Sequence, residues 1–162
     1  MRFVLQNALI GLVLASFAAF ATSASAQSAD RGMGTWKLNV QKSKYSPGPA
    51  PKAGTITTTA VAGGSFKTIN DQTPPTGAST KFEVTYKFDG KDNKAIGNPN
   101  ADTQSYSRVD DRHWTVVSKK NGKVTVTSKI EVSADGKSRT TTQTGTDAQG
   151  KAVNNFIWYD KQ

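Results

Sequence analysis

The chain has 162 residues, a formal net charge of +9, 35% hydrophobic residues, one histidine and no cysteine. The lack of cysteine excludes disulfides, thiolate nucleophiles and zinc or iron–sulfur sites held by cysteine. With a single histidine, the side chains that build most metal sites and acid–base catalysts are also missing. The composition therefore favours one small soluble domain with no cofactor, no metal site and no enzymatic activity.

Residues 1–26 have the layout of a secretory signal peptide. Arg2 supplies a positive charge, residues 8–21 form a nearly unbroken apolar run, and residues 24–26 (ASA) make a small-residue cleavage site. The run of 14 residues is shorter than the roughly 20 that span a bilayer as a helix, which disfavours an uncleaved membrane anchor. We predict cleavage after Ala26 and a periplasmic or secreted location in a bacterium. The mature chain then has 136 residues and a net charge of +8, since Arg2 is the only charge removed.

The rest of the chain divides into a short flexible leader, residues 27–33, and one predicted domain, residues 34–162. Short runs rich in Thr, Val, Ile and aromatic residues alternate with Gly, Pro, Asn and Asp throughout the domain, and no helical period appears. This pattern is typical of strands joined by turns. The expected strands are 35–40, 54–60, 66–71, 80–88, 103–109, 113–119, 123–133, 137–146 and 152–159, with a further short one at 94–97.

Turns containing Gly-Lys recur, and Gly122, Gly136 and Gly150 lie 14 residues apart, which favours a meander of hairpins. We expect three-residue loops ending at these glycines, because that register places the apolar residues of neighbouring strands on one face. The expected opposite pairs are Trp114–Ser128, Val116–Val126, Ser118–Val124, Ile130–Thr140, Thr140–Trp158 and Thr142–Phe156. The inward residues would be Trp114, Val116, Val124, Val126, Ile130, Val132, Phe156 and Trp158, with Thr140, Thr142 and Thr144. Arg139 and Gln143 would point outward, but if two of the loops have two residues, these two side chains move inside.

The predicted strands 35–40 and 80–88 alternate in the same way, with an apolar, aromatic face and a charged, hydrophilic face. A sheet of this kind, with no helix to cover it, must close on itself or pack on a second sheet. Residues 41–52, with three prolines, are expected to form an ordered surface loop after the first strand. The predicted fold is an all-β, antiparallel up-and-down meander of 8–10 strands closed into a barrel.

Several stretches of the chain resemble known proteins. They are residues 34–39 (GTWKLN), 42–51 (KSKYSPGPAP), 153–155 (VNN) and 159–161 (YDK). With the meander, they resemble the calycin superfamily of lipocalins and fatty-acid-binding proteins, and more closely a group of small exported, uncharacterised bacterial lipocalin-like proteins. The resemblance implies a calycin-like barrel whose interior can hold a ligand. The chain departs from the pattern because residues 41–53 are too short and Pro-rich for a helical lid, and because no helix follows the last strand.

Three other interpretations are disfavoured. His113 next to Asp110 and Asp111 is interpreted as part of a solvated turn rather than as a base or metal ligand, and the Asp and Asn residues between 92 and 102 lack the spacing of a calcium loop. Export and the dispersed lysines argue against nucleic acid as a partner, leaving only weak, salt-sensitive contact with anionic envelope polymers. A membrane-spanning barrel would need an apolar outer band, whereas the outer faces here carry Lys81, Glu83, Lys87, Lys129 and Glu131.

The inward aromatic stripe predicts that the barrel binds a small apolar or amphipathic molecule in its interior. The candidate ligand-binding residues are Trp36, Phe82, Tyr86, Tyr106, Arg108, Trp114, Thr142, Phe156 and Trp158. Arg108 would pair with a ligand carboxylate only if its side chain points inward. The alternative is a solid barrel with a structural or cell-envelope role that uses its basic surface. An interior pocket of roughly 300 Å³ or more would favour the binding protein.

Overall fold

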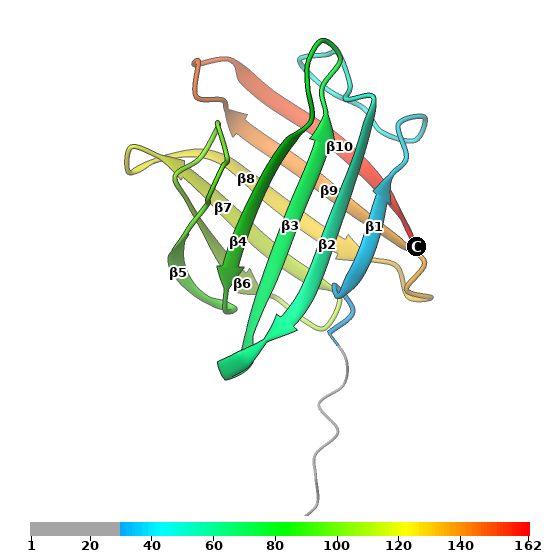
Figure 1. Cartoon of the computed structure of the whole chain (residues 1–162), viewed down its shortest axis with the longest axis vertical. Helices are drawn as coiled ribbons and strands as arrows, with labels where there is room; N and C mark the ends of the chain where they lie inside the picture. Colours follow the sequence, from blue (N-terminus) through cyan, green and yellow to red (C-terminus); the bar gives the residue numbers. More distant parts are fainter. Residues whose placement is uncertain (1–29) are drawn as a thin grey trace, which may run out of the picture.

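The computed structural model describes residues 30–162, so the predicted signal peptide and the start of the leader lie outside the described residues. Ten strands form one antiparallel sheet in the order β4-β3-β2-β1-β10-β9-β8-β7-β6-β5, which curls into a barrel (Figure 1). The strands are β1 (Gly34–Leu38), β2 (Ala53–Val61), β3 (Ser65–Thr73), β4 (Thr80–Tyr86), β5 (Asp89–Lys94), β6 (Thr103–Arg108), β7 (His113–Lys120), β8 (Lys123–Val132), β9 (Ser138–Thr146) and β10 (Ala152–Lys161). The all-β, up-and-down meander is confirmed. None of the described residues belongs to a helix long and apolar enough to span a membrane.

The chain runs up and down the barrel, so its turns and loops gather at two ends. The lower end holds residues 30–33 and the turns at 61–65, 109–112 and 133–137. The upper end holds the loops at 39–52, 74–79, 95–102 and 147–151 (Figure 1). These two names are used below.

The barrel is nearly closed at one seam, between β4 and β5. Here Glu83 and Ile96 exchange two backbone hydrogen bonds of 2.9 Å, and this isolated bridge replaces a full strand pairing. Across the same seam, the rings of Tyr86 and Tyr106 stack with centroids 3.5 Å apart. The predicted short strand at 94–97 overlaps β5 (Asp89–Lys94) only at Lys94, so its predicted position was wrong. The exposed, charged sequence of β5 lacks the apolar alternation that marks the other strands.

The Pro-rich segment continues the wall of the barrel beside the upper part of β10. β1 is only half as long as β10, and pairs only with its last residues. Beyond β1, Lys44 and Phe156 exchange backbone hydrogen bonds of 2.7 and 2.8 Å, and the Ser46 carbonyl accepts one from the Asn154 amide at 2.7 Å. Tyr45, between these two anchored residues, lines the barrel interior.

The hairpin between β7 and β8 differs from the predicted three-residue loop. Asn121 and Gly122 form a two-residue turn with φ of +50° and +74°, as a type I′ turn requires. A bulge at Thr125 then adds one residue to β8. The observed pairs are Lys119–Val124, Ser118–Val126, Val116–Ser128 and Trp114–Ile130. The predicted pairs in this hairpin are therefore wrong. The turn and the bulge together shift the register by two residues, so the side chains of β8 beyond the bulge keep their predicted faces. Val124, which precedes the bulge, is the exception: it was predicted to face inward and is 59% exposed.

Gly145 makes room for this bulge. It lies opposite Val126 with φ of +142°, and a Cβ atom there would be 2.1 Å from the carbonyl oxygen of Thr125. Only glycine fits this close approach of two backbones.

The hairpin between β8 and β9 reverses the predicted faces of β9. Ile130 pairs with Thr141 rather than with Thr140, because the loop at 134–137 has four residues instead of the expected three. Side chains alternate along a strand, so a shift of one residue moves each of them to the opposite face. The inward residues of β9 are Arg139, Thr141 and Gln143, and the outward ones are Thr140, Thr142 and Thr144.

This reversal also determines the faces of β10. The predicted pairs between β9 and β10, Thr140–Trp158 and Thr142–Phe156, are confirmed. Because the register between these strands is as predicted, the reversed faces of β9 imply reversed faces of β10 as well. Ile157 and Tyr159 point inward and are buried, at 3% exposure each. The prediction that Thr142, Phe156 and Trp158 face the interior is therefore wrong.

The lower end of the barrel is closed by residues 30–33 and by Trp36. The Trp36 indole Nε1 donates a hydrogen bond of 2.9 Å to the carbonyl of Gly32, and the Trp36 side chain is fully buried. The Lys161 ammonium lies 4.1 Å from the centre of the Trp36 ring and donates to the carbonyl of Met33. These contacts hold residues 30–33 and Trp36 across the lower end of the barrel.

Candidate ligand-binding cavity

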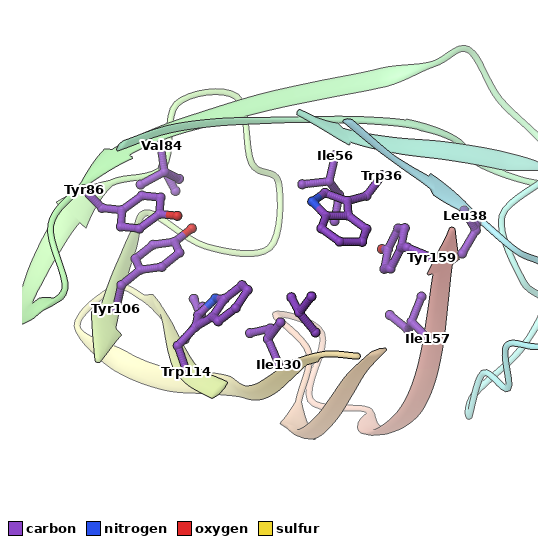
Figure 2. Packing of buried hydrophobic residues seen from close by; sticks show 13 residues of the cluster. Trp36, Leu38, Ile56, Val84, Tyr86, Tyr106, Trp114, Ile130, Ile157 and Tyr159 are labelled. Atoms are coloured by element: carbon purple, nitrogen blue, oxygen red, sulfur yellow. The ribbon is translucent and has the colours of Figure 1, made fainter. Parts of the chain in front are cut away.

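A cavity of about 300 Å³ lies inside the barrel. Residues of β2, β3, β4 and of β6 to β10 line it, together with Tyr45 and with Asn98, Asn100, Ala101 and Asp147 from the upper loops. Figure 2 shows the side chains of the buried cluster pointing at one another across the interior from opposite walls. The interior is therefore not filled solid by its aromatic residues. The volume is at the lower limit of typical ligand pockets, which suits a compact molecule.

The wall of the cavity changes in chemistry from the lower to the upper end, strand by strand. Going upward, the inward side chains are Phe66-Thr68-Asn70-Gln72 on β3, Tyr106-Gln104 on β6, Arg139-Thr141-Gln143 on β9 and Tyr159-Ile157-Asn155 on β10. We call the part formed by Tyr86, Tyr106, Trp114, Tyr159 and Arg139 the aromatic end. We call the part formed by Asn70, Gln72, Gln104, Gln143 and Asn155 the amide end. The cavity is thus mainly aromatic at its lower end, and amide side chains gather at its upper end, where Phe82, Val126, Val153 and the acidic Asp147 also line it.

At the aromatic end, rings pack closely around the lower half of the cavity. The stacked pair of Tyr86 and Tyr106 contacts Phe88 edge-on, and the Phe88 ring also packs edge-on against Trp114 at 6.1 Å (Figure 2 labels the two tyrosines and Trp114). Such arrangements add stabilisation beyond the area that the rings bury. The aromatic end is therefore a rigid, apolar wall.

Arg139 is a buried cation within this wall. Its side chain is only 8% exposed, and its guanidinium lies 5.4 Å from the Trp114 ring and 5.8 Å from the Tyr159 ring. Within residues 30–162, Arg139 has no carboxylate partner in an ion pair, and its Nε atom is buried without a hydrogen bond. Burial lowers the pKa of Arg139, but a guanidinium stays protonated at neutral pH. The cavity therefore contains a buried positive charge that no carboxylate among residues 30–162 contacts directly. The charge of Asp30 acts on Arg139 without such contact, and the Asp30 carboxylate is itself paired with Arg108.

The protein has four tyrosines, and all of them line the cavity. Burial is the main cause that raises the pKa of each phenol, namely Tyr45, Tyr86, Tyr106 and Tyr159. At neutral pH all four are uncharged hydroxyl groups. The Tyr106 hydroxyl donates to the Gln104 side-chain oxygen at 2.9 Å, whereas the Tyr45 hydroxyl is buried without a partner in the described part of the chain.

At the amide end, hydrogen bonds orient three of the five amides. Gln104 donates to the Ser118 hydroxyl at 3.0 Å, Gln143 donates to the Ser128 hydroxyl at 3.3 Å, and Asn155 donates to the Gln143 oxygen at 3.0 Å. The Asn155 oxygen accepts a hydrogen bond from the Ser46 amide at 2.9 Å, which ties the Pro-rich segment to the cavity wall. This end is thus an ordered polar surface.

Three buried polar atoms lack a hydrogen-bond partner among residues 30–162: the Tyr45 hydroxyl, Arg139 Nε and the Thr141 hydroxyl. All three belong to residues that line the cavity. Buried polar groups in folded proteins are nearly always paired, and an unmade bond costs about 1–3 kcal/mol. Polar groups of a molecule inside the cavity would satisfy these atoms.

The structure places four of the predicted ligand-binding residues on the cavity wall: Phe82, Tyr86, Tyr106 and Trp114. Trp36 is buried below the cavity and is not part of its wall. Thr142, Phe156 and Trp158 lie on the outer face.

Arg108 does not enter the cavity. It forms an ion pair with Asp30 at the lower end, and its guanidinium stacks 3.8 Å above the centre of the Phe88 ring. Its charge is therefore already neutralised.

Our main prediction missed the residues that the reversed strands bring inside. They are Arg139, Thr141, Gln143, Asn155, Ile157 and Tyr159. The sequence analysis had indicated part of this set, because the alternative register with shorter loops turns Arg139 and Gln143 inward. The structure confirms the inward orientation of these two side chains. Tyr45 lies in the segment predicted as a surface loop, where no alternation indicated which side chain would turn inward.

His113 lies outside the cavity, in the turn where we predicted it. Its Nδ1 atom is 2.8 Å from both carboxylate oxygens of Asp110, and its Nε2 atom is 3.6 Å from Glu131. Backbone hydrogen bonds, first from Arg112, and the His113 side chain lower the pKa of the Asp110 carboxyl group. These contacts stabilise the turn between β6 and β7.

No family model and no curated protein sequence matches the chain. Solved structures do match. The wild-type fluorescent protein UnaG superposes with a TM-score of 0.53 at 19% identity, and the match covers 82% of this chain and 98% of UnaG. A mutant of UnaG superposes with a TM-score of 0.55 at 19% identity, and the match covers 82% of this chain and 96% of the mutant. The S-type phycobiliprotein lyase CPES from Guillardia theta gives a TM-score of 0.50 at 12% identity, covering 82% of this chain and 89% of the lyase. With the strand order, these matches show that the chain has a calycin-type fold, an antiparallel up-and-down β-barrel.

Proposed function

We propose that this protein is an exported, non-catalytic binding protein that holds a compact amphipathic molecule inside its barrel, with an anionic group of that molecule paired to Arg139. The observation that carries the proposal is the buried guanidinium of Arg139, which faces the cavity with no carboxylate in direct contact among residues 30–162, since Asp30 is paired with Arg108. A buried charge is costly unless it is paired, and an Arg fork matches a carboxylate with two parallel hydrogen bonds. A bound carboxylate would supply the missing counter-charge.

The surroundings of Arg139 support an amphipathic rather than a fully polar ligand. Trp114, Tyr86 and Tyr106 present aromatic surface next to the guanidinium. Such surface gains free energy by covering an apolar body, at roughly 25 cal/mol per Å² of area removed from water. The fold likeness to UnaG and the lyase supports the barrel architecture in which such a cavity occurs.

The test is a titration with a dansylated fatty acid, followed by dansyl fluorescence, with the corresponding methyl ester as the uncharged comparison. We expect the acid to bind and the ester to bind more weakly. Arg139→Met should weaken binding of the acid by about 10- to 100-fold, because a hydrogen-bonded charge contributes about 1.5–3 kcal/mol.

Arg108→Met is the matched control, since Arg108 is paired with Asp30 away from the cavity. It should bind the acid as the native protein does. Equal binding of acid and ester, an unchanged affinity in Arg139→Met, or no binding of either probe would contradict the proposal. Native mass spectrometry of the purified protein, before any probe is added, would show by the added mass whether a small molecule stays bound to the protein through purification.

A further inference from the structure

We infer that the amide end of the cavity is a second polar subsite, which selects ligands that carry a hydrogen-bonding group at the end opposite their anionic group. The inference rests on the proposed function and specifies its ligand class. The preferred ligand is bifunctional, with a carboxylate at Arg139, an apolar middle, and a distal hydroxyl, carbonyl or amide group.

The first argument is where the amides lie. Five amide side chains on four different strands line the upper part of the cavity: Asn70, Gln72, Gln104, Gln143 and Asn155. Inward positions of a small barrel are normally filled by apolar side chains that pack on one another. Here amide side chains take inward positions in the upper part of each of these strands, beside the apolar side chains of Phe82, Val126 and Val153.

The second argument is the hydrogen-bonding capacity that remains free. Each amide has two N–H donors and an oxygen acceptor, and the internal bonds of Gln104, Gln143 and Asn155 use only part of this capacity. On the facing wall, the side chains of Asn70 and Gln72 make no hydrogen bond to another residue within 30–162. The subsite thus combines amides that are fixed in orientation with amides that are free to meet a ligand.

The third argument is the distance between the two polar regions. Arg139 and Gln143 lie on the same strand, four residues apart, and Tyr159 and Asn155 repeat this spacing on the neighbouring strand. At about 3.3 Å per residue, the separation along the barrel is roughly 13 Å. An unsubstituted fatty acid anchored at Arg139 would bring its apolar tail against the amides and remove them from water without replacing their hydrogen bonds. That loss disfavours a simple fatty acid relative to one with a polar terminus.

The experiment compares decanoic acid with its terminally hydroxylated counterpart, each competing with the dansylated fatty acid on the full mature chain. We expect the hydroxy acid to bind about tenfold more tightly than decanoic acid. In Asn70→Leu/Gln72→Leu this preference should disappear or reverse, because the free amides become apolar. This variant removes no internal side-chain hydrogen bond of the described structure.

Asn154→Leu is the matched control, because Asn154 neighbours Asn155 on β10 but lies on the outer face. It should keep the native preference. Tighter or equal binding of decanoic acid by the native protein would overturn the inference and leave the carboxylate site of Arg139 intact. A preference that survives in Asn70→Leu/Gln72→Leu would overturn it as well. If neither acid competes, the proposed function fails and the inference fails with it.

Discussion

The two halves of the barrel interior are built from the same strands but differ in how they are held together. At and below the aromatic end, apolar side chains are closely packed: Trp36 and Val132 are fully buried, and the stacked rings of Tyr86 and Tyr106 close the seam beside β4. At the amide end, the inward side chains are held by hydrogen bonds between Gln143, Asn155 and Ser128. Apolar burial contributes far more free energy than exchangeable hydrogen bonds do. We therefore expect the lower half to supply the stability of the fold and the upper half to supply selectivity.

Arg139 is the exception within the aromatic end, since it places a charge where the packing is most apolar. In the ligand-free protein we expect the buried charge of Arg139 to lower the free energy of unfolding, although it lies in the half of the barrel that contributes most of the stability. A stability loss of this kind is typical of functional sites, where a group is retained for binding.

The largest expected effect is alkaline unfolding of the tyrosine-rich interior. Burial raises the pKa of Tyr86, Tyr106, Tyr159 and Tyr45 above the unfolded value near 10. The folded state thus keeps these phenols neutral, and its stability is complete below pH 10 and falls as the pH rises beyond it. Above pH 10, each phenol that stays neutral in the folded state but ionises in the unfolded state lowers the free energy of unfolding by up to about 1.4 kcal/mol per pH unit.

Circular dichroism should therefore show unfolding above about pH 10, coinciding with a cooperative rise in tyrosinate absorbance. Tyr106→Phe should move the transition to higher pH. Gradual tyrosine ionisation near pH 10 in a protein that stays folded would show that the interior is open to water.

Truncating the largest buried side chain should have the next largest effect. Trp36→Ala is expected to lower the free energy of unfolding by about 3–5 kcal/mol, because it leaves a cavity and removes the hydrogen bond to Gly32. Trp158→Ala, on the outer face, should cost about 1 kcal/mol, because Trp158 is only half-buried. Urea denaturation of the two variants would measure the difference, and equal losses would contradict the division between interior and exterior.

Arg139→Met should change stability in the opposite direction. Replacing an unpaired buried charge by an apolar side chain of similar length is expected to raise the free energy of unfolding of the ligand-free protein by about 1–3 kcal/mol. The same variant should lose the affinity for an anionic probe. A less stable Arg139→Met would show that the guanidinium has a partner inside the folded protein.

The smallest effect is expected at the amide end. Asn70→Leu should change the free energy of unfolding by less than about 0.5 kcal/mol, since the Asn70 side chain lines the cavity and has no hydrogen bond to break within residues 30–162. Thermal denaturation of Asn70→Leu, measured together with the native protein and Trp36→Ala, would test this expectation. A loss comparable to that of Trp36→Ala would remove the distinction between the two halves.

The strands could be predicted because their residues alternate, and nine of them were expected close to where they lie. The aromatic end was anticipated through Tyr86, Tyr106 and Trp114, which sit on strands whose inward face the apolar residues identify. β9 consists largely of Thr, Ser and Gln, so neither of its faces is apolar and its orientation has to be inferred from loop length alone. A single extra residue in the loop at 134–137 reversed that inference, and with it the positions of Arg139 and Trp158.

The sequence by itself determined that this chain is an up-and-down meander of antiparallel strands, because β-branched and aromatic alternation and Gly-containing turns are local signals. Only the tertiary structure decided which side chains of β9 and β10 face the cavity. In a sheet, each strand takes its orientation from the pairing with its neighbour, so a register set in one hairpin is passed on to the next strand. The buried charge of Arg139 and the amides above it are the product of that pairing.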